Sequence, residues 1–257
     1  MISKLSDLVE IAKSKRKRKI AVAAAGDYDV LEALKTADLE GIVEPVLVGD
    51  QARIEKICNE IGFRISKYEI FNVADKFESS LKASQLIRDG HADLLMKGLV
   101  STGQLLKAVL NKEHGLRKGD IISHVAIFES PYYHKLLAIT DAAMNVSPTF
   151  EEKIALINNA VEVYHLLGEK NPKVAVVGAV ETVNQRMEST MHAATLSMMN
   201  KRQQITGCTI DGPLALDNAV SKKAAEVKNI QSEVAGNVDI IVAPDINGAN
   251  FLYKSLN

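Results

Sequence analysis

Residues 92–110 read "ADLLMKGLVSTGQLLKAVL", and this stretch carries the strongest indication of the fold. The apolar run that ends at Met96 has the length of a buried strand. The apolar residues after Ser101 recur at helical spacing, so we expect a strand to end near Lys97 and a helix to begin near Ser101. A strand that passes through a glycine-containing loop into a helix is typical of βα units around a mostly parallel sheet.

The same alternation continues on both sides of this stretch. Short apolar runs such as "KIAVAAA" (19–25), "EPVLVG" (44–49) and "KVAVVGAV" (173–180) alternate with segments of helical period. The sequence therefore predicts an α/β protein with two α/β domains of mostly parallel sheets, 1–140 and 141–257. Ligands of such proteins tend to bind in the cleft between the domains, so we expect an interdomain cleft here.

The middle of the chain departs from this rhythm. "SHVAIFES" (123–130) and "KLLAITDAAMNV" (135–146) are two strand-like runs separated by "PYYH". They predict either an antiparallel hairpin or a crossover between subdomains. Thr149 should then open a long helix, with Glu152 as its capping-box partner.

Composition and charge exclude several classes of function. The chain has 257 residues with a formal net charge of −1, so no overall field favours nucleic acid or an anionic membrane. No segment reaches the roughly 18 apolar residues of a membrane span, and the first 25 residues lack the order of a signal peptide. The basic run "KSKRKRK" (13–19) is interpreted as the solvated end of the first helix. A cytoplasmic protein is expected.

Neither the cysteines nor the histidines form a recognisable metal site. Cys58 and Cys208 match no CxxC or zinc spacing, which favours reduced thiols. The six histidines form no HxxxH or HExxH pattern, so no metal site is expected. His124, which follows Ser123, is either a structural histidine or a residue at the edge of the cleft.

The loop "KGLVSTG" (97–103) is the first candidate for chemistry. Its glycines are spaced as in a P-loop, but Gln104 and Leu105 stand where that motif needs Lys and Ser or Thr, so it is not a nucleotide triphosphate motif. A strand end, a helix N-terminus and Lys97 together suit a phosphate or a carboxylate. Alternatively, Ser101 and Gln104 form a capping box and Lys97 is a surface charge. The two interpretations are compatible.

Three further loops are rich in polar residues. In "ITDAAMNVSPT" (139–149), Asp141 and Asn145 can orient a nucleophile or bind hydroxyls, or Asp141 can form an Asx-turn. In "TIDGPLALDNAVS" (209–221), Asp211 and Asp217 are acid/base groups of a strand-to-helix loop, or turn and cap residues. The loop "APDINGANFLYK" (243–254) holds more polar residues than a plain turn requires.

Together these loops resemble a known family. "ADLLMKGLVSTGQLLKAVL", "AITDAAMNVSPT", "TIDGPLALDNAV" and "VDIIVAPDINGANFLYKSL" are similar, in order and spacing, to the phosphate butyryltransferase and phosphate acetyltransferase family, with a better fit to the butyryl branch. The resemblance covers nearly the whole chain from Lys19 onward. Its most specific pieces are "MKGLVSTG", "TDAAMNV" and "PDINGAN".

The resemblance implies a phosphate acyltransferase. Such an enzyme exchanges a short-chain acyl group, butyryl or branched-chain, between coenzyme A and inorganic phosphate, and it gives acyl phosphate through a ternary complex without a covalent enzyme intermediate. The resemblance further implies a cytoplasmic homodimer or larger assembly with its site in the interdomain cleft. Acyl-CoA and phosphate would be substrates, with no bound cofactor and no metal.

The resemblance also assigns roles to residues of the loops. It places one group around phosphate or acyl phosphate, a second group on the opposite wall of the cleft, and a third on the side of the second domain. In that order, these groups are Lys97, Gly98, Ser101 and Thr102; Ser123, His124, Asp141 and Asn145; and Asp245, Asn247 and Asn250.

One departure from the family pattern concerns catalysis. In the family the chain continues past the segment that here reads "GANFLYK", through another strand, to a Ser-Arg motif and an Asp that are held to stabilise the oxyanion and activate the thiol. This sequence ends at Asn257, so the second domain is expected to lack the C-terminal strand and helix of the family, and no catalytic residue is assigned. The alternative is a catalytically impaired protein that binds coenzyme A or phosphate. A metal- and nicotinamide-dependent dehydrogenase is disfavoured, because no cluster of metal-binding aspartates is present.

Overall fold

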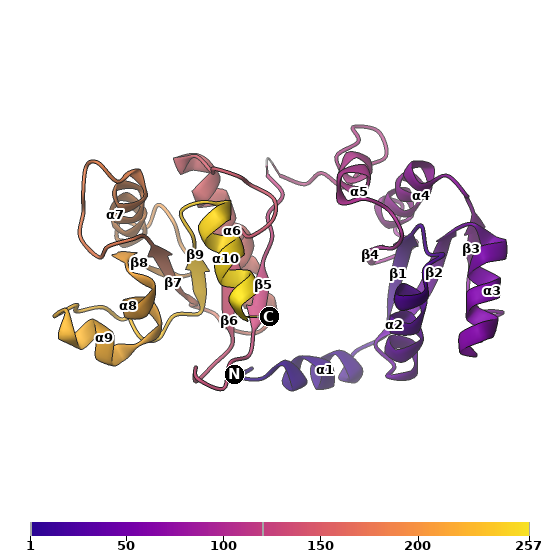
Figure 1. Cartoon of the computed structure of the whole chain (residues 1–257), viewed down its shortest axis with the longest axis horizontal. Coiled ribbons are helices and arrows are strands. Elements are labelled where there is room, and N and C mark those ends of the chain that lie inside the picture. Colours follow the sequence, from indigo (N-terminus) through magenta and orange to yellow (C-terminus); the bar gives the residue numbers. More distant parts are fainter. Residues whose placement is uncertain (1, 120, 257) are drawn as a thin grey trace. The chain divides into compact units, whose positions relative to one another are not determined.

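The computed structural model describes residues 2–119 and 121–256 (Figure 1). The chain forms two compact units: one is Val9–Gly119, and the other runs from Asp120 to the C-terminus and includes the first eight residues. Each unit contains one β-sheet with helices, which confirms the predicted α/β class. Helix α1 (Leu5–Ser14), which has no buried residue, precedes the first sheet.

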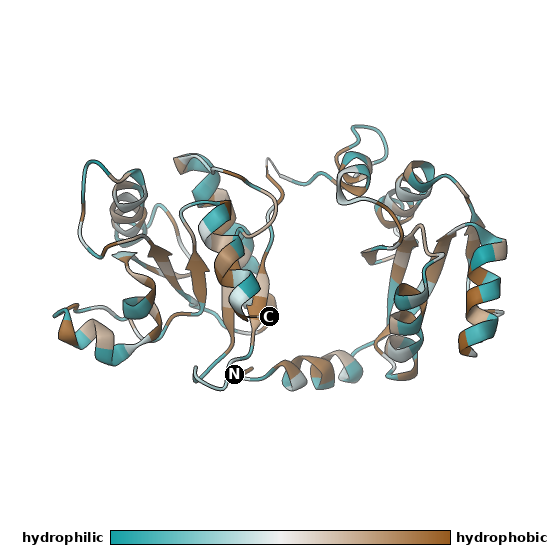
Figure 2. Cartoon of the chain, in the orientation of Figure 1, coloured by the Kyte–Doolittle hydropathy of each residue, from teal (hydrophilic) through white to brown (hydrophobic). Residues whose placement is uncertain are grey.

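The unit of residues 9–119 contains a four-stranded parallel sheet with the strand order β3-β2-β1-β4. Its strands are β1 (Arg18–Ala23), β2 (Val43–Gly49), β3 (Ile70–Asn72) and β4 (Leu94–Lys97). Its helices are α2 (Tyr28–Leu39), α3 (Gln51–Ile61), α4 (Lys76–Arg88) and α5 (Thr102–Val109). The strands are its most hydrophobic segments (Figure 2).

Helices cover this sheet on both faces. Leu31 of α2 and Ile54 of α3 pack on one face. Ala83 and Leu86 of α4, with Leu105 of α5, pack on the other. The neighbouring strands β1 and β4 thus send their following helices to opposite faces.

The other unit contains a five-stranded mixed sheet with the order β5-β6-β9-β7-β8. Its strands are β5 (Ala126–Phe128), β6 (Leu137–Thr140), β7 (Lys173–Val177), β8 (Thr209–Leu214) and β9 (Ile240–Val242). Helices α6 (Phe150–Leu166) and α7 (Glu188–Lys201) pack on one face, and α8 (Leu216–Val220), α9 (Lys222–Val227) and α10 (Ile246–Leu256) pack on the other.

Two local predictions in this unit are confirmed. Strands β5 and β6 pair antiparallel, so the hairpin is the correct alternative for residues 123–146. Thr149 caps α6, and its capping box with Glu152 is complete. Strand β6 also pairs in parallel with β9, about a hundred residues further along the chain. The hairpin of β5 and β6 thus belongs to the same compact unit as β9.

Each unit holds one cysteine in its core. Cys58 of α3 and Cys208, just before β8, are both buried free thiols. Burial raises the pKa of each thiol to about 11, so both are protonated at neutral pH. None of the described helices is both long and apolar enough to cross a bilayer. In the described part of the chain, no three His, Cys, Asp or Glu side chains are grouped to hold a metal ion.

Candidate functional site

The segment of residues 97–102, called the Lys97 loop below, follows β4 at the carboxyl edge of the first sheet. It lies beside the end of β1, because Ala23 pairs with Lys97. The helices after β1 and β4 pack on opposite faces, so this is the topological switch point of the sheet. Ligands of open α/β sheets bind at such a point.

Close backbone packing explains the glycine of this loop. The N–H groups of Gly98 and Leu99 donate to the carbonyl oxygens of Ala23 and Ala24, each at 2.8 Å. A Cβ on Gly98 would lie only 2.3 Å from the Ala24 oxygen. The N–H of Val100 donates to the Gly98 oxygen at 2.9 Å. These three N–H groups hold the loop in place, and they are not available to bind an anion.

Ser101 and Lys97 stabilise the same loop with their side chains. Ser101 caps α5: its Oγ accepts from the N–H of Gln104 at 3.2 Å and donates to Gln104 Oε1 at 3.0 Å. The capping interpretation is therefore confirmed, although the Gln104 side chain bonds to the serine hydroxyl instead of to its backbone. Lys97 Nζ donates to the oxygens of Gly98 (3.2 Å) and Val100 (3.1 Å).

Several hydrogen-bond donors of the Lys97 loop have no acceptor among the described residues and could bind a ligand. They are the third hydrogen of the Lys97 ammonium group, the exposed hydroxyl of Thr102, and the N–H groups of Thr102 and Gly103, which have no acceptor within the helix. An ammonium group beside the N-terminus of a helix suits an anion.

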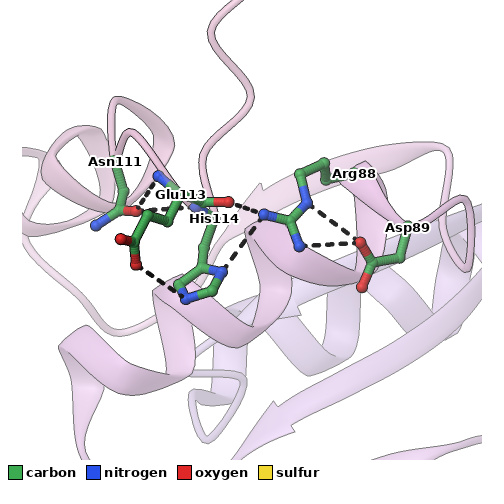
Figure 3. A network of polar contacts seen from close by, with 5 residues as sticks. All are labelled: Arg88, Asp89, Asn111, Glu113 and His114. Carbon is green, nitrogen blue, oxygen red and sulfur yellow. Dashed lines mark hydrogen bonds and ion pairs between the residues drawn. The ribbon is translucent and has the colours of Figure 1, made fainter.

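The far end of α5 is also anchored (Figure 3). Arg88, the last residue of α4, donates to the carbonyl oxygen of Glu113 and pairs with Asp89 at 3.1 Å. The Oδ1 atom of Asn111 accepts the N–H groups of Glu113 and His114, each at 2.9 Å. The segment that follows α5 is thus held to the end of α4, and Ser101 caps the other end of α5.

In the other unit, Asp141 shapes the loop that follows β6. The side chain is 3% exposed, and its Oδ1 accepts the N–H groups of Ala143 and Met144, each at 2.9 Å. Its Oδ2 accepts from Asn145 Nδ2 at 2.6 Å. The Asx-turn alternative is therefore confirmed. Both carboxylate oxygens of Asp141 already accept hydrogen bonds from the loop, so this side chain stabilises the conformation of the loop.

Hydrogen bonds from two asparagines draw three segments together around this loop. Asn145 Nδ2 also donates to the oxygen of Ile122 at 2.9 Å, which fixes the segment that carries Ser123. From α10, Asn250 Nδ2 donates to the oxygen of Ala142 at 2.9 Å. The structure thus brings Ser123, Asn145 and Asn250 into one polar cluster.

His124 lies at the edge of the same cluster. Its ring packs edge-on against Tyr253 of α10, with 5.5 Å between the ring centroids. Its Nδ1 is buried and has no hydrogen-bond partner among the residues that the structure describes. Ser123 Oγ accepts from Asn159 Nδ2 at 2.9 Å, which leaves the serine hydroxyl hydrogen free to donate.

The remaining candidate residues belong to strand and helix ends. Asp245 Oδ1 accepts the N–H of Gly248 at 2.9 Å at the start of α10, where Asn247 is exposed. Asp211 lies within β8 and Asp217 in the first turn of α8. The strand-to-helix loop expected for Asp211 is therefore wrong, because the strand continues through "DGP" to Leu214.

The candidate residues thus fall into two groups, one in each unit. Lys97, Gly98, Ser101 and Thr102 share one loop in the unit of residues 9–119. Ser123, His124, Asp141, Asn145, Asp245, Asn247 and Asn250 all lie in the other unit. The interdomain cleft stays a prediction.

Sequence reasoning missed a contact between a buried lysine and a partly buried histidine in the unit that follows residue 120. Lys153, in the first turn of α6, is 5% exposed, and its Nζ lies 3.2 Å from His192 Nδ1 of α7. His192 Nε2 lies 3.7 Å from Glu188. Burial lowers the pKa of both Lys153 and His192. A lysine in the first turn of a helix interacts unfavourably with the helix dipole. This unusual position is the feature of the sequence that could have identified Lys153.

Arg53 is a second cation that the sequence reasoning did not single out. It lies in the first turn of α3, at the carboxyl edge of the first sheet. Its stem passes so close to Gly26 that a Cβ there would lie 3.1 Å from Arg53 Cδ. The Arg53 guanidinium makes no ion pair with any residue that the structure describes, so it adds an unpaired positive charge near the end of β1.

Comparison with known proteins connects these features to a family. The family model described as phosphate acetyl/butaryl transferase matches residues 3–80 and 75–257. A phosphate butyryltransferase of Clostridium acetobutylicum is 47% identical over 256 residues, which are 100% of this chain and 85% of the relative. A phosphate acetyltransferase of Thermotoga maritima is 46% identical over 98% of this chain and 85% of the relative.

Solved structures agree with this comparison. A branched-chain phosphotransacylase of Enterococcus faecalis has a TM-score of 0.80 and 32% identity, over 93% of this chain and 83% of that chain. A phosphotransacetylase of Streptococcus pyogenes has a TM-score of 0.78 at 20% identity, over 98% of this chain and 85% of that chain, which shows the shared fold. On these matches, this chain belongs to the phosphate acetyl/butaryl transferase family.

Proposed function

We propose that this protein exchanges a short-chain acyl group, butyryl or branched-chain, between coenzyme A and inorganic phosphate. In this reaction a phosphate oxygen attacks the carbonyl carbon of acyl-CoA. A C–O bond forms, the C–S bond breaks, and the departing thiolate of coenzyme A takes up a proton. The similarity to a phosphate butyryltransferase and to a branched-chain phosphotransacylase supports this choice of acyl group.

The observation that carries the proposal is the geometry of the Lys97 loop. The attacking group is an anion, and a second negative charge develops on the carbonyl oxygen during the attack. Lys97 holds its ammonium group at the end of β4, beside the first turn of α5, through bonds to two backbone oxygens. A cation fixed in this way can bind phosphate with little reorganisation.

Residues of the other unit have supporting roles in the proposal. The cluster of Ser123, His124 and Asn250 offers hydroxyl, imidazole and amide groups to the acyl-CoA, and Asp141 shapes the loop beside them. The proposal places this cluster across an interdomain cleft from the Lys97 loop. It also places the protein in the cytoplasm as a homodimer or larger assembly, with no cofactor.

Release of free thiol tests the reaction. The purified chain is mixed with phosphate and with acetyl-, butyryl- or isobutyryl-CoA, and the thiol is followed with a chromogenic reagent. We expect kcat/KM for butyryl- or isobutyryl-CoA to exceed that for acetyl-CoA by about tenfold, because each methylene in an apolar pocket contributes roughly 1–3 kcal/mol. A preference for acetyl-CoA would overturn the acyl assignment. Coenzyme A binding by calorimetry without thiol release would contradict the transferase proposal itself.

The role of Lys97 is tested by its phosphate dependence. We expect Lys97→Ala to raise the KM for phosphate at least about tenfold, since a hydrogen bond to a charged group contributes roughly 1.5–3 kcal/mol. Lys107→Ala is the matched control, because Lys107 lies on α5 with its Nζ over the ring of Phe77 at 5.2 Å. An unchanged KM for phosphate in Lys97→Ala would remove Lys97 from the site.

A further inference from the structure

We infer that Ser79 of α4 is a positioning residue that sets the conformation of the Lys97 loop from outside the site. The inference rests on the proposed function, because it assigns the loop to phosphate. Ser79 is fully buried in the first turn of α4. Its hydroxyl accepts the N–H of Ala24 at 2.7 Å and donates to the carbonyl oxygen of Val48 at 3.0 Å. The Ser79 side chain therefore connects α4 to the carboxyl ends of β1 and β2.

Ala24 is the residue on which this contact acts. Its φ is +53°, in the left-handed region that residues other than glycine seldom adopt. Such a conformation persists only where the surroundings enforce it. Ser79 fixes the N–H of Ala24, and Leu99 of the Lys97 loop donates to the carbonyl oxygen of Ala24 at 2.8 Å. The two bonds hold the Ala24 backbone from both sides.

The orientation of Ala24 is transmitted directly to the Lys97 loop. Gly98 lies so close to Ala23 and Ala24 that its position depends on where their carbonyl oxygens point. Gly98 and Val100 in turn supply the two oxygens that receive the hydrogen bonds of Lys97 Nζ. A continuous series of bonds thus runs from the Ser79 hydroxyl, through Ala24 and Leu99, to the ammonium group of Lys97.

Removal of the Ser79 hydroxyl has an asymmetric effect on its two partners. The oxygen of Val48 also accepts the N–H of Ala25 at 2.9 Å, so it keeps one hydrogen bond without Ser79. The N–H of Ala24 loses the acceptor described above and becomes a buried donor without a partner. The peptide between Ala23 and Ala24 is then expected to rotate, which moves the Ala23 oxygen away from the N–H of Gly98.

The same helix supplies a matched control. Ser84 of α4 is also fully buried, but its Oγ has no hydrogen-bond partner among the described residues. Ser84→Ala removes the same atoms as Ser79→Ala from the same helix, without breaking a hydrogen bond. Any difference between the two variants therefore reports on the bonds of Ser79 and not on the lost volume.

Hydrogen exchange without substrate tests the structural part of the inference. We expect the amides of Gly98 and Leu99 to exchange about tenfold faster in Ser79→Ala, and at the wild-type rate in Ser84→Ala. Exchange is measured well below the melting transition of each variant. Ala24→Gly, added to Ser79→Ala, should restore part of the protection, because glycine adopts a positive φ without strain. Equal exchange in Ser79→Ala and Ser84→Ala would overturn the inference.

Kinetics test the functional part. We expect Ser79→Ala to raise the KM for phosphate about fivefold with kcat nearly unchanged, which a general loss of stability would not produce. If Ser79→Ala exchanged faster but kept the wild-type KM for phosphate, Ser79 would not be a positioning residue for the reaction. The assignment of the Lys97 loop to phosphate would also be overturned. A chain that releases no thiol at all would contradict the proposed function, and the exchange rates would still decide whether Ser79 sets the loop.

Discussion

The buried Lys153 contacts the partly buried His192, and a positive charge on Lys153 disfavours a second one on the imidazole. The 3.2 Å between Lys153 Nζ and His192 Nδ1 allows a hydrogen bond only while the imidazole is neutral. Burial first, and the charge of Lys153 second, hold the pKa of His192 below its ordinary value of 6.5. Glu188 and Glu151 act in the opposite direction, and Asp245 lies near Lys153.

This pair predicts how the stability of the second unit depends on pH. The unfolded chain binds the proton of His192 at a higher pH than the folded chain does, so the folded state is favoured above about pH 6.5 and loses stability as the pH falls below that value. In His192→Asn this loss should be smaller, because the asparagine oxygen accepts from Lys153 without titrating. Urea unfolding between pH 7 and pH 5 measures the difference, with the exposed His91→Asn as control. Equal pH profiles for the wild type and His192→Asn would contradict the prediction.

At the scale of the elements, the close contact between the ends of β1 and β4 predicts that one methyl group added at Gly98 lowers the free energy of unfolding. Gly98→Ala would place a Cβ 2.3 Å from the Ala24 oxygen and 2.5 Å from the Ala23 oxygen. Overpacking of this kind typically destabilises by about 1–3 kcal/mol, and backbone atoms cannot move aside easily. Gly103→Ala is the comparison. Gly103 lies in α5, and a Cβ added there would have no atom within 4 Å.

The two substitutions should change the free energy of unfolding in opposite directions. In α5, replacement of glycine by alanine is expected to stabilise by about 0.5–1 kcal/mol. The free energy of unfolding of the unit of residues 9–119, measured in urea by circular dichroism, compares them. If Gly98→Ala were as stable as Gly103→Ala, the close approach of β4 to β1 would be refuted.

The elements also show what the sequence could predict. The βα unit around residues 92–110 and the capping box of α6 depend on neighbours within a few residues, and local patterns predicted both. The hairpin was one of two open interpretations, and the antiparallel pairing of β5 with β6 distinguished them. The insertion of β9 between β6 and β7 pairs Ile240 with Ala138 and with Val174, and both lie far from it in the sequence, so no local pattern indicated it.

The candidate site was less predictable for the same physical reason. The capping role of Ser101 follows from a residue three positions away, whereas the bond from Ser79 to Ala24 spans 55 residues. The Asx-turn of Asp141 was one of two open interpretations, and only the geometry distinguished them. The contact of Lys153 with His192 joins two helices whose packing the sequence alone does not define.

For the molecule as a whole, the two units have separate cores. The apolar clusters around Leu31 and Ala83 lie in the unit of residues 9–119, and those around Ile241 and Ile157 lie in the other. Units with cores of their own can open independently. We therefore expect two unfolding events, and a single two-state transition observed by every probe would contradict this.

The one buried thiol in each core provides an internal reporter for these events. A protonated, inaccessible thiol does not react with an alkylating reagent until its surroundings open. Cys208→Ala leaves only Cys58, and Cys58→Ala leaves only Cys208, so the labelling rate of each variant in increasing urea follows the opening of one half of the chain. The order in which the two thiols react would then rank the halves by stability without any added fluorophore.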